Sequence, residues 1–145
     1  MEVRRVRHGD IPQLMRFIQN YHISSNLSDI PFDKKSMTKI IDYYRQARDS
    51  VALIAVKDGR ITGLLFGSIE PFFFNQKRSY ATDLMFFAKA GGVQLWRHFV
   101  DWAWSMGASR VMMGVSSGDD RADQLFDVLG MEQTGGMYVL RQESS

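Results

Sequence analysis

Two adjacent glycines, Gly91 and Gly92, separate an apolar strand-like run from the start of a helical apolar stripe. A helix that begins directly after a strand leaves free backbone N–H groups in its first turn, and together with the helix dipole these groups favour a bound phosphate. Glycine lets this backbone approach a ligand closely because it has no Cβ atom. An ordinary strand-to-helix turn, in which small residues serve only packing, is the more common explanation of a lone Gly-Gly pair. The pair therefore indicates an anion site only where other features of the chain agree with it.

The composition indicates one globular domain and excludes several kinds of chemistry. The chain has 145 residues, of which 45% are hydrophobic and 23% charged, as expected of a domain with its own core. Because it contains no cysteine, disulfides, zinc–thiolate sites and a cysteine nucleophile are excluded. Three scattered histidines without neighbouring acidic residues give no metal-ligand set. A net charge of +2 permits an anionic ligand but argues against strong binding to nucleic acid.

The sequence gives no sign of a membrane or an export route. Its apolar runs are far shorter than the roughly 20 residues of a membrane-spanning helix. The first residues lack the apolar core of a signal peptide. We therefore expect a cytoplasmic protein without a membrane partner.

Local signals divide the chain into strands and helices. Asp10 and Asp33 are suited to cap helices, Gly107 is suited to end one, and Asp58-Gly59 between two apolar runs predicts a β-hairpin. The expected order is β-α-α-β-β-β-α-β-α-β, with antiparallel hairpins first. This order predicts a single α/β domain over residues 1–145, with a mixed, mostly antiparallel sheet and helices on both faces. We expect strands at 2–7, 51–56, 61–69, 79–88, 110–115 and 132–141, and helices at 11–21, 34–48, 93–106 and 120–129.

Four stretches of the chain occur in a specific order and spacing. Residues 51–69 form a strand pair joined by an Asp-Gly turn, and residues 81–87 form the strand before the glycines. Residues 91–108 contain Asp-Trp-Ala and Met-Gly-Ala, and residues 115–131 contain Asp-Arg-Ala and Leu-Phe-Asp-Val-Leu-Gly-Met. Together, over nearly the whole chain, these stretches resemble the GCN5-related N-acetyltransferase (GNAT) family. The sequence Gly-Val-Ser-Ser-Gly at 114–118 is similar to the short, often phage-encoded branch of that family.

The resemblance implies a GNAT-like fold and an acetyl-CoA-dependent N-acetyltransferase, with acetyl-CoA as co-substrate and no metal. An amine acceptor, either a small molecule or a protein, would attack the thioester directly while both substrates are bound. The family's pyrophosphate loop corresponds to residues 87–92, a shortened version in which Phe87 stands where glutamine or arginine is usual. The residues that the resemblance assigns to the cofactor are Phe86, Phe87, Lys89, Ala90, Gly91, Gly92, Val93 and Asp119.

Acyl transfer to an amine needs a base, because an amine at pH 7 is mostly protonated. The resemblance implies that Asp83 is this base, since an acidic residue on the fourth strand often has this role in the family. The alternative is that Asp83 is an ordinary strand carboxylate that pairs with an arginine or faces water. The family's usual tyrosine acid on the last helix is Phe126 here, so the group that protonates the departing thiolate is absent. Tyr138 on the last expected strand, or Ser116, could donate in its place, although each also fits an ordinary sheet or turn residue.

The acceptor would enter over two connections, residues 22–32 and 70–78, whose Asp29 and Glu70 could meet a cationic amine. Three consecutive phenylalanines at 72–74 cannot all point inward in an extended chain. They therefore predict a contact in a homodimer, an apolar wall of the acceptor site or a loop folded over the sheet.

Two alternatives to an enzyme remain open. The first is a GNAT-fold binding module that acts by contact with CoA or another protein, which the shortened loop and Phe126 favour. The second is a protein that modifies or binds nucleic acid, against which the modest charge argues.

Overall fold

The chain forms five strands and four α-helices within residues 1–114 and 120–142, the part that the computed structural model describes. The strands are β1 (Glu2–Arg5), β2 (Ser50–Lys57), β3 (Arg60–Phe72), β4 (Asn75–Ala88) and β5 (Val111–Met112). The helices are α1 (Ile11–Ser24), α2 (Lys34–Gln46), α3 (Gly92–Ser105) and α4 (Asp120–Val128), with a short 3-10 turn, η1, at His8–Asp10. No helix within these ranges is long and apolar enough to cross a membrane.

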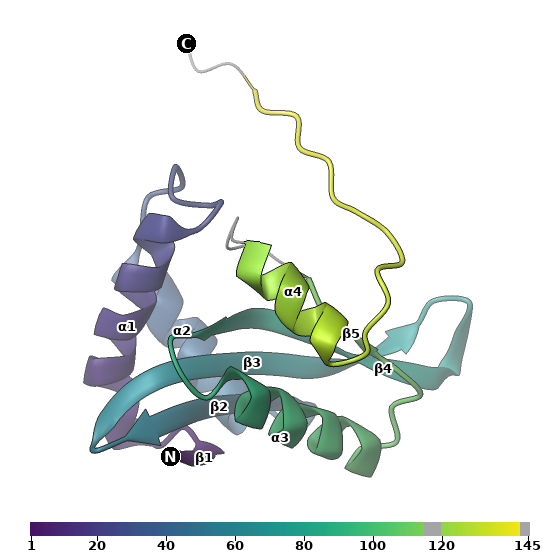
Figure 1. The fold of residues 1–145 in the computed structure, drawn as a ribbon, viewed down its shortest axis with the longest axis horizontal. Coiled ribbons are helices and arrows are strands. Elements are labelled where there is room, and N and C mark those ends of the chain that lie inside the picture. Colours follow the sequence, from purple (N-terminus) through teal and green to yellow (C-terminus); the bar gives the residue numbers. More distant parts are fainter. Residues whose placement is uncertain (115–119, 143–145) are drawn as a thin grey trace.

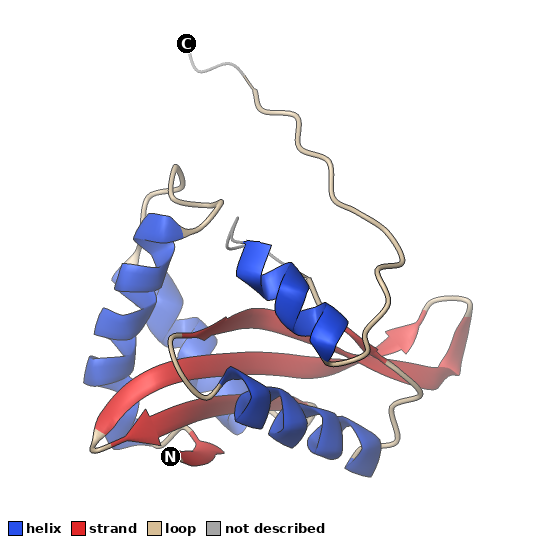
Figure 2. Cartoon of the chain, viewed as in Figure 1, coloured by secondary structure: helices blue, strands red, loops and turns tan. Residues whose placement is uncertain are grey.

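The strands form one mixed sheet in the order β1-β2-β3-β4-β5 (Figures 1 and 2). Neighbouring strands are antiparallel except β4 and β5, which are parallel. Alternate side chains of β3 serve opposite faces: Leu64 and Phe66 pack in the core with α1 and α2, whereas Leu65 packs in the core with α3. The α/β class, the mostly antiparallel sheet and the helices on both faces are confirmed.

The hairpin turn at Asp58-Gly59 is confirmed. Both residues have positive φ, +52° and +76°, which is the backbone of the tight turn whose twist matches that of the flanking strands. The N-cap role of Asp33 is also confirmed, because its side chain accepts a hydrogen bond from the Ser36 backbone N–H.

The connection expected at 70–78 is instead a continuation of the β3–β4 hairpin. Glu70 pairs with Tyr80 and Pro71 with Ser79, and the chain turns at Phe73 and Phe74. The register is irregular next to Pro71, which is where a residue without an N–H group is tolerated in a ladder. Phe73 and Phe74 are exposed and lie against each other, with ring centroids 4.0 Å apart. The structure thus leaves two of the three phenylalanines exposed to solvent.

Two further expectations are wrong. Helix α1 continues through His22 to Ser24, so the loop that follows it begins later than expected. Residues 132–141, expected as the last strand, have no regular secondary structure and are exposed. The sequence of this segment fits a strand. A strand, however, exists only where a neighbouring strand supplies hydrogen bonds. This segment leaves the sheet (Figure 1) and has no such neighbour among the described residues.

Candidate functional site

Strand β4 continues well beyond its parallel partner β5. The two strands pair over only two residues, whereas β4 extends to Ala88. Residues 83–88 therefore have no strand beside them on the β5 side, within the part of the chain that the structure describes. An open strand edge of this kind offers backbone hydrogen bonds to an extended ligand. The paired residues are Ala81 with Val111 and Thr82 with Met112.

A bulge in β4 lies next to the point where this pairing ends. Against β3, Phe66 pairs with Met85 but Gly67 pairs with Asp83, so Leu84 is the extra residue. A bulge bends its strand and changes the direction of the adjacent groups. Leu84 is exposed.

Asp83 lies at the end of the β4–β5 pairing. Its Oδ1 accepts a 3.1 Å hydrogen bond from the backbone N–H of Gly114, just beyond β5. Burial raises the pKa of the Asp83 carboxyl to about 6, and hydrogen bonds from the backbone N–H groups of Gly114 and of Asp83 itself oppose this increase only in part. A carboxyl group that titrates near neutral pH can take a proton from an amine and release it again.

Strand register places Asp83 on the α3 face of the sheet. Directly paired residues share a face, and its partner Gly67 lies so close to α3 that a Cβ atom there would be 2.3 Å from the Phe99 ring. The carboxyl is thus on the same face as the start of α3.

The first turn of α3 is open to an anion. Gly91 is the N-cap, no side chain caps the helix, and the first turn contains no acidic residue. The N–H groups of Lys89 and Ala90 both donate to the carbonyl of Thr62, at 2.8 and 3.3 Å, so the preceding loop is held against β3. The first-turn N–H groups that follow, beginning with that of Gly92, are those a phosphate would meet.

The two glycines at this turn have different physical roles. Gly91 has a φ of +87°, and a Cβ atom there would lie 2.8 Å from the Cβ of Ala55, so the fold itself requires glycine. A Cβ atom on Gly92 would meet its neighbours at ordinary contact distances of 3.6 to 3.9 Å. Those neighbours are Ala88, Leu125 and Phe86.

Helix α4 packs beside the end of β4 and the start of α3. Leu125 is among the neighbours of Gly92, and the ring centroid of Phe126 lies 6.1 Å from that of Phe86. Phe126 thus packs against the sheet beside Phe86 of β4. The two α4 side chains at this part of the site, Leu125 and Phe126, are therefore both hydrocarbon.

Several solved structures of acetyltransferases match this chain over its whole length. The aminoglycoside antibiotic 6'-N-acetyltransferase AAC(6')-IG of Acinetobacter haemolyticus matches with a TM-score of 0.74 and 12% identity, covering 100% of both chains. The ribosomal-protein-alanine N-acetyltransferase of Brucella melitensis matches with a TM-score of 0.73 and 14% identity, covering 98% of this chain and 100% of that one. AAC(6')-Iy, in complex with the bisubstrate analogue CoA-S-monomethyl-acetylneamine, matches with a TM-score of 0.76 and 14% identity, covering 99% of this chain and 98% of that one. The chain has the GNAT fold.

No family model matches the sequence, and no curated protein matches it significantly. The GNAT fold is therefore established by three-dimensional likeness, with little identity in the residues.

Most of the expected cofactor residues gather within this GNAT fold at one place. Residues 89–93 form the loop and first turn described above, and Phe86 lies beside Gly92. Phe87 points to the opposite face of the sheet, where its ring centroid lies 4.6 Å from Tyr21 in the core under α1. Asp119 lies outside the described residues.

Of the two expected proton donors, Tyr138 is not brought to Asp83. Tyr138 lies in the C-terminal segment and is 98% exposed. Ser116 lies outside the described residues. The hydrogen-bond partner that the structure gives Asp83 is instead the backbone N–H of Gly114, which the sequence did not predict.

Thr62 is a site-positioning residue that sequence reasoning missed. Its carbonyl accepts two hydrogen bonds from the loop before α3, and its hydroxyl donates to the carbonyl of Ala90 at 3.0 Å. A threonine shortly after a hairpin turn is common in strands, so the sequence carries no signal that could have found it.

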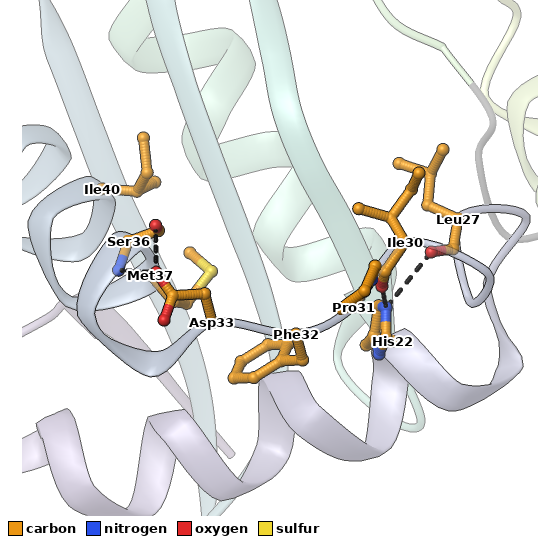
Figure 3. Close-up of a pocket in the computed structure, with 9 residues that line it drawn as sticks. All are labelled: His22, Leu27, Ile30, Pro31, Phe32, Asp33, Ser36, Met37 and Ile40. Carbon is orange, nitrogen blue, oxygen red and sulfur yellow. Dashed lines mark hydrogen bonds between the residues drawn. The ribbon is translucent and has the colours of Figure 1, made fainter.

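A hollow lies away from this site, between the end of α1 and the start of α2 (Figure 3). It has a volume of about 380 Å³ and a mostly apolar lining. The Nε2 atom of His22 lies 2.6 Å from the Ile30 carbonyl oxygen and 3.1 Å from that of Leu27. Because carbonyl oxygens only accept hydrogen bonds, Nε2 carries the proton and holds the loop over the hollow. The lining residues are His22, Leu27, Ile30, Pro31, Phe32, Asp33, Ser36, Met37 and Ile40.

Proposed function

We propose that this protein is an N-acetyltransferase that moves an acetyl group from acetyl-CoA to an amine. One arrangement carries the proposal: a carboxyl with a pKa of about 6 and the uncapped start of α3 lie on one face, at two ends of an open strand edge. From Asp83 to Ala88 the strand spans roughly 16 Å at about 3.3 Å per residue. An extended thiol-bearing arm laid along that edge would reach from a phosphate at α3 to the carboxyl.

The residues at the α3 end suit the diphosphate of CoA. The first-turn N–H groups of Gly92 and Val93 would donate to phosphate oxygens, and the exposed Lys89 adds a positive charge. Gly92 has no side chain to cover these N–H groups. A Cβ atom there would meet its neighbours only at ordinary contact distances.

Asp83 would act as the base. Above pH 6 its carboxylate is ionised in the folded protein and can accept the proton that the amine must lose before it attacks the thioester. The Gly114 N–H holds one carboxylate oxygen, which leaves the other to face the substrate. When bound, acetyl-CoA supplies the activated acetyl group and a thiolate that leaves without much help from an acid.

The acceptor is an amine, and we propose that Asp29 and the exposed Glu70 attract its positive charge. Asp29 lies in the loop after α1, beside the apolar hollow. Among similar structures, one is named for an aminoglycoside and another for the alanine of a ribosomal protein. Both are primary amines, so a useful panel contains an aminoglycoside, an Ala-initiated peptide and a polyamine.

A binding module without turnover is the second candidate, and one observation favours it. The α4 ring beside Phe86 is that of Phe126, which cannot donate a proton to a leaving thiolate. Such a protein would bind CoA and release no free thiol with any amine.

Two measurements test these proposals together. Native mass spectrometry of the purified full chain should detect co-purified CoA, and a free-thiol assay with the amine panel should detect turnover. Binding with turnover supports the enzyme, whereas binding without turnover supports the module. Absence of both binding and turnover at millimolar acetyl-CoA would contradict both.

A further inference from the structure

A smaller hollow, of about 280 Å³, lies between the tip of the β3–β4 hairpin and the residues that precede β5. Its lining combines aromatic rings with arginine side chains and polar groups. The lining residues are Phe72, Phe74, Asn75, Arg78, Ser109 and Arg110. Because the hairpin tip and the start of α3 lie at opposite ends of β4 (Figure 1), this hollow is separate from the proposed phosphate site.

Hydrogen bonds hold the two walls of the hollow together. The N–H and the hydroxyl of Ser109 both donate to the Ser79 carbonyl, at 2.8 and 3.0 Å. The Ala81 N–H donates to the Arg110 carbonyl at 2.9 Å. The segment before β5 is therefore tied to β4 in the free protein.

Positive charge gathers around this hollow. Residues 71–82 and 105–114, which form its walls, contain three basic residues and no acidic one. The basic residues are Lys77, Arg78 and Arg110. Neither arginine forms an ion pair with a described residue, and Glu70, just before the first segment, does not line the hollow. Guanidinium groups of this kind are suited to phosphate, which they can bind through two parallel hydrogen bonds.

The exposed ring of Phe74 can accept a flat ligand group. The Phe72 ring already has neighbours, since its centroid lies 4.8 Å from that of Tyr80 and 5.5 Å from the Arg110 guanidinium carbon. Phe74 lines the hollow, is 88% exposed and lies against Phe73, with ring centroids 4.0 Å apart. Exposed rings beside cations bind single-stranded nucleic acids, whose bases stack on the rings while the phosphates meet the cations.

We propose that this hollow binds a single-stranded nucleic acid, with a base against the Phe74 ring and the adjoining phosphates at Arg78 and Arg110. The Asn75 side chain adds a polar contact. Its Oδ1 accepts a hydrogen bond from the Lys77 N–H at 3.1 Å, so its NH₂ group can donate to the base or to a phosphate.

Two other occupants fit the hollow less well. A second copy of this chain would bring the same three cations against each other, and like charges repel. A membrane surface would cover the rings at the tip but leave the polar lining, Asn75 and Ser109, without partners.

Binding through three cations should be weak and should depend strongly on salt. Each phosphate neutralised on a single strand contributes about −0.7 to the slope of log affinity against log salt concentration. Three such contacts predict a slope of about −2. Weak binding agrees with the net charge of only +2.

The salt slope tests the cations. The full chain is titrated into a fluorescein-labelled oligothymidylate at several salt concentrations, and anisotropy reports binding. Arg78→Gln and Arg110→Gln, both at exposed positions, should each weaken binding and change the slope to about −1.4. Arg16→Gln removes the same charge from α1, far from the hairpin tip (Figure 1), and should match the parent. No binding by the parent, or equal losses from all three variants, would overturn the proposal.

Loss of the Phe74 ring tests the stacked base. Phe74→Leu keeps an apolar side chain and should lower the affinity about fivefold or more. Tyr43→Leu, which removes an exposed ring from α2, should leave the affinity unchanged. The same strand paired with its complement should bind more weakly, although it carries more charge, because its bases are already stacked. Equal affinities of Phe74→Leu and the parent would show an anion site without a base and would contradict the proposal.

Competitors identify the occupant. Excess CoA should not displace the oligothymidylate, because the start of α3 lies at the other end of β4. Thymidine monophosphate should compete poorly, since it offers one phosphate to three cations. Displacement by CoA would place the oligothymidylate at the acetyl-transfer site. Equal competition by thymidine monophosphate would indicate a site for free nucleotides, and preferential binding to phosphatidylserine vesicles would indicate a membrane surface. Each of these three results would overturn the proposal.

Discussion

The backbone N–H of Gly114 donates a 3.1 Å hydrogen bond to Oδ1 of Asp83, which ties the end of β5 to the bulge region of β4. This single bond spans the point at which the two strands cease to pair. It orients a partly buried carboxylate without neutralising it, because a backbone N–H carries no full charge. Burial therefore remains the largest influence on the pKa of Asp83, which is about 6.

Asp83→Asn should lower turnover by roughly 10²–10⁴ at pH 7, because the amide cannot accept the proton of the amine. In the parent, the rate should rise with pH and reach half of its plateau at about pH 6, where the carboxyl is half ionised. Affinity for acetyl-CoA should be almost unchanged, since the phosphates lie at the other end of the open edge. Asp101→Asn, an exposed carboxylate on α3, is the matched control. Equal activity of Asp83→Asn and the parent at pH 7 would show that Asp83 is structural.

The same substitution should stabilise the protein at neutral pH. The pKa of Asp83 is raised on folding from 3.8 to about 6, so between these values the folded state binds more protons than the unfolded state. The free energy of unfolding therefore falls as pH rises from about 4 to 6, by roughly 1–3 kcal/mol from this group. Asp83→Asn keeps an oxygen for the Gly114 N–H but removes the partly buried charge, and so should not show that fall.

Thermal melts of both proteins from pH 4 to 7.5 measure this difference. Asp10, held by Arg4, and Asp33, held by Ser36, have lowered pKa values, so their stabilisation is lost only as pH falls below this window. Parallel curves for the parent and Asp83→Asn between pH 4 and 6 would show that the carboxyl is not desolvated.

Substitution of Gly92 should affect the binding of acetyl-CoA, whereas substitution of Gly91 should affect the stability of the fold. Acetyl-CoA should raise the melting temperature of the parent by mass action. Gly92→Glu should abolish that increase by placing an anion against the phosphates, whereas Gly92→Ala should retain most of it. Both should fold, because a Cβ atom at Gly92 meets its neighbours at ordinary distances. A normal increase with Gly92→Glu would place the phosphates elsewhere.

Gly91→Ala should instead destabilise the protein before any ligand is added. The left-handed backbone costs a non-glycine residue about 1–2 kcal/mol, and the close approach to Ala55 adds to that cost. Chemical denaturation of the apo protein measures the loss. A variant as stable as the parent would mean that the turn can relax.

Much of this fold follows from local sequence signals. Asp58-Gly59 sets a turn through its own backbone preference, and Asp33 caps α2 through its own side chain, so neither depends on distant contacts. The strand expected at 132–141 does not form, because a strand depends on a neighbour and not only on its own pattern.

The parts of the site that depend on local sequence were predictable, and the parts that depend on distant contacts were not. The turn at Gly91 and Gly92 is local, and the structure places it at the start of α3. The face to which Phe87 points depends on the β3–β4 register, with Leu64 opposite it on the α1 side. The role of Thr62 depends on a contact across 28 residues, which no local pattern reveals.

Phe126→Tyr tests both the register of α4 and the need for an acid. The Phe126 ring is partly buried and lies beside Phe86, at the open part of β4. If its edge reaches the opening, a hydroxyl there can be hydrated, and the free energy of unfolding should stay within about 1 kcal/mol of the parent. The hydroxyl would then face the departing thiolate, and turnover should be retained or increased. Denaturant melts and the free-thiol assay measure the two effects, with Phe126→Leu as the control for ring loss. A loss of roughly 1–3 kcal/mol would instead indicate an unpaired buried hydroxyl and a ring that faces away from the site.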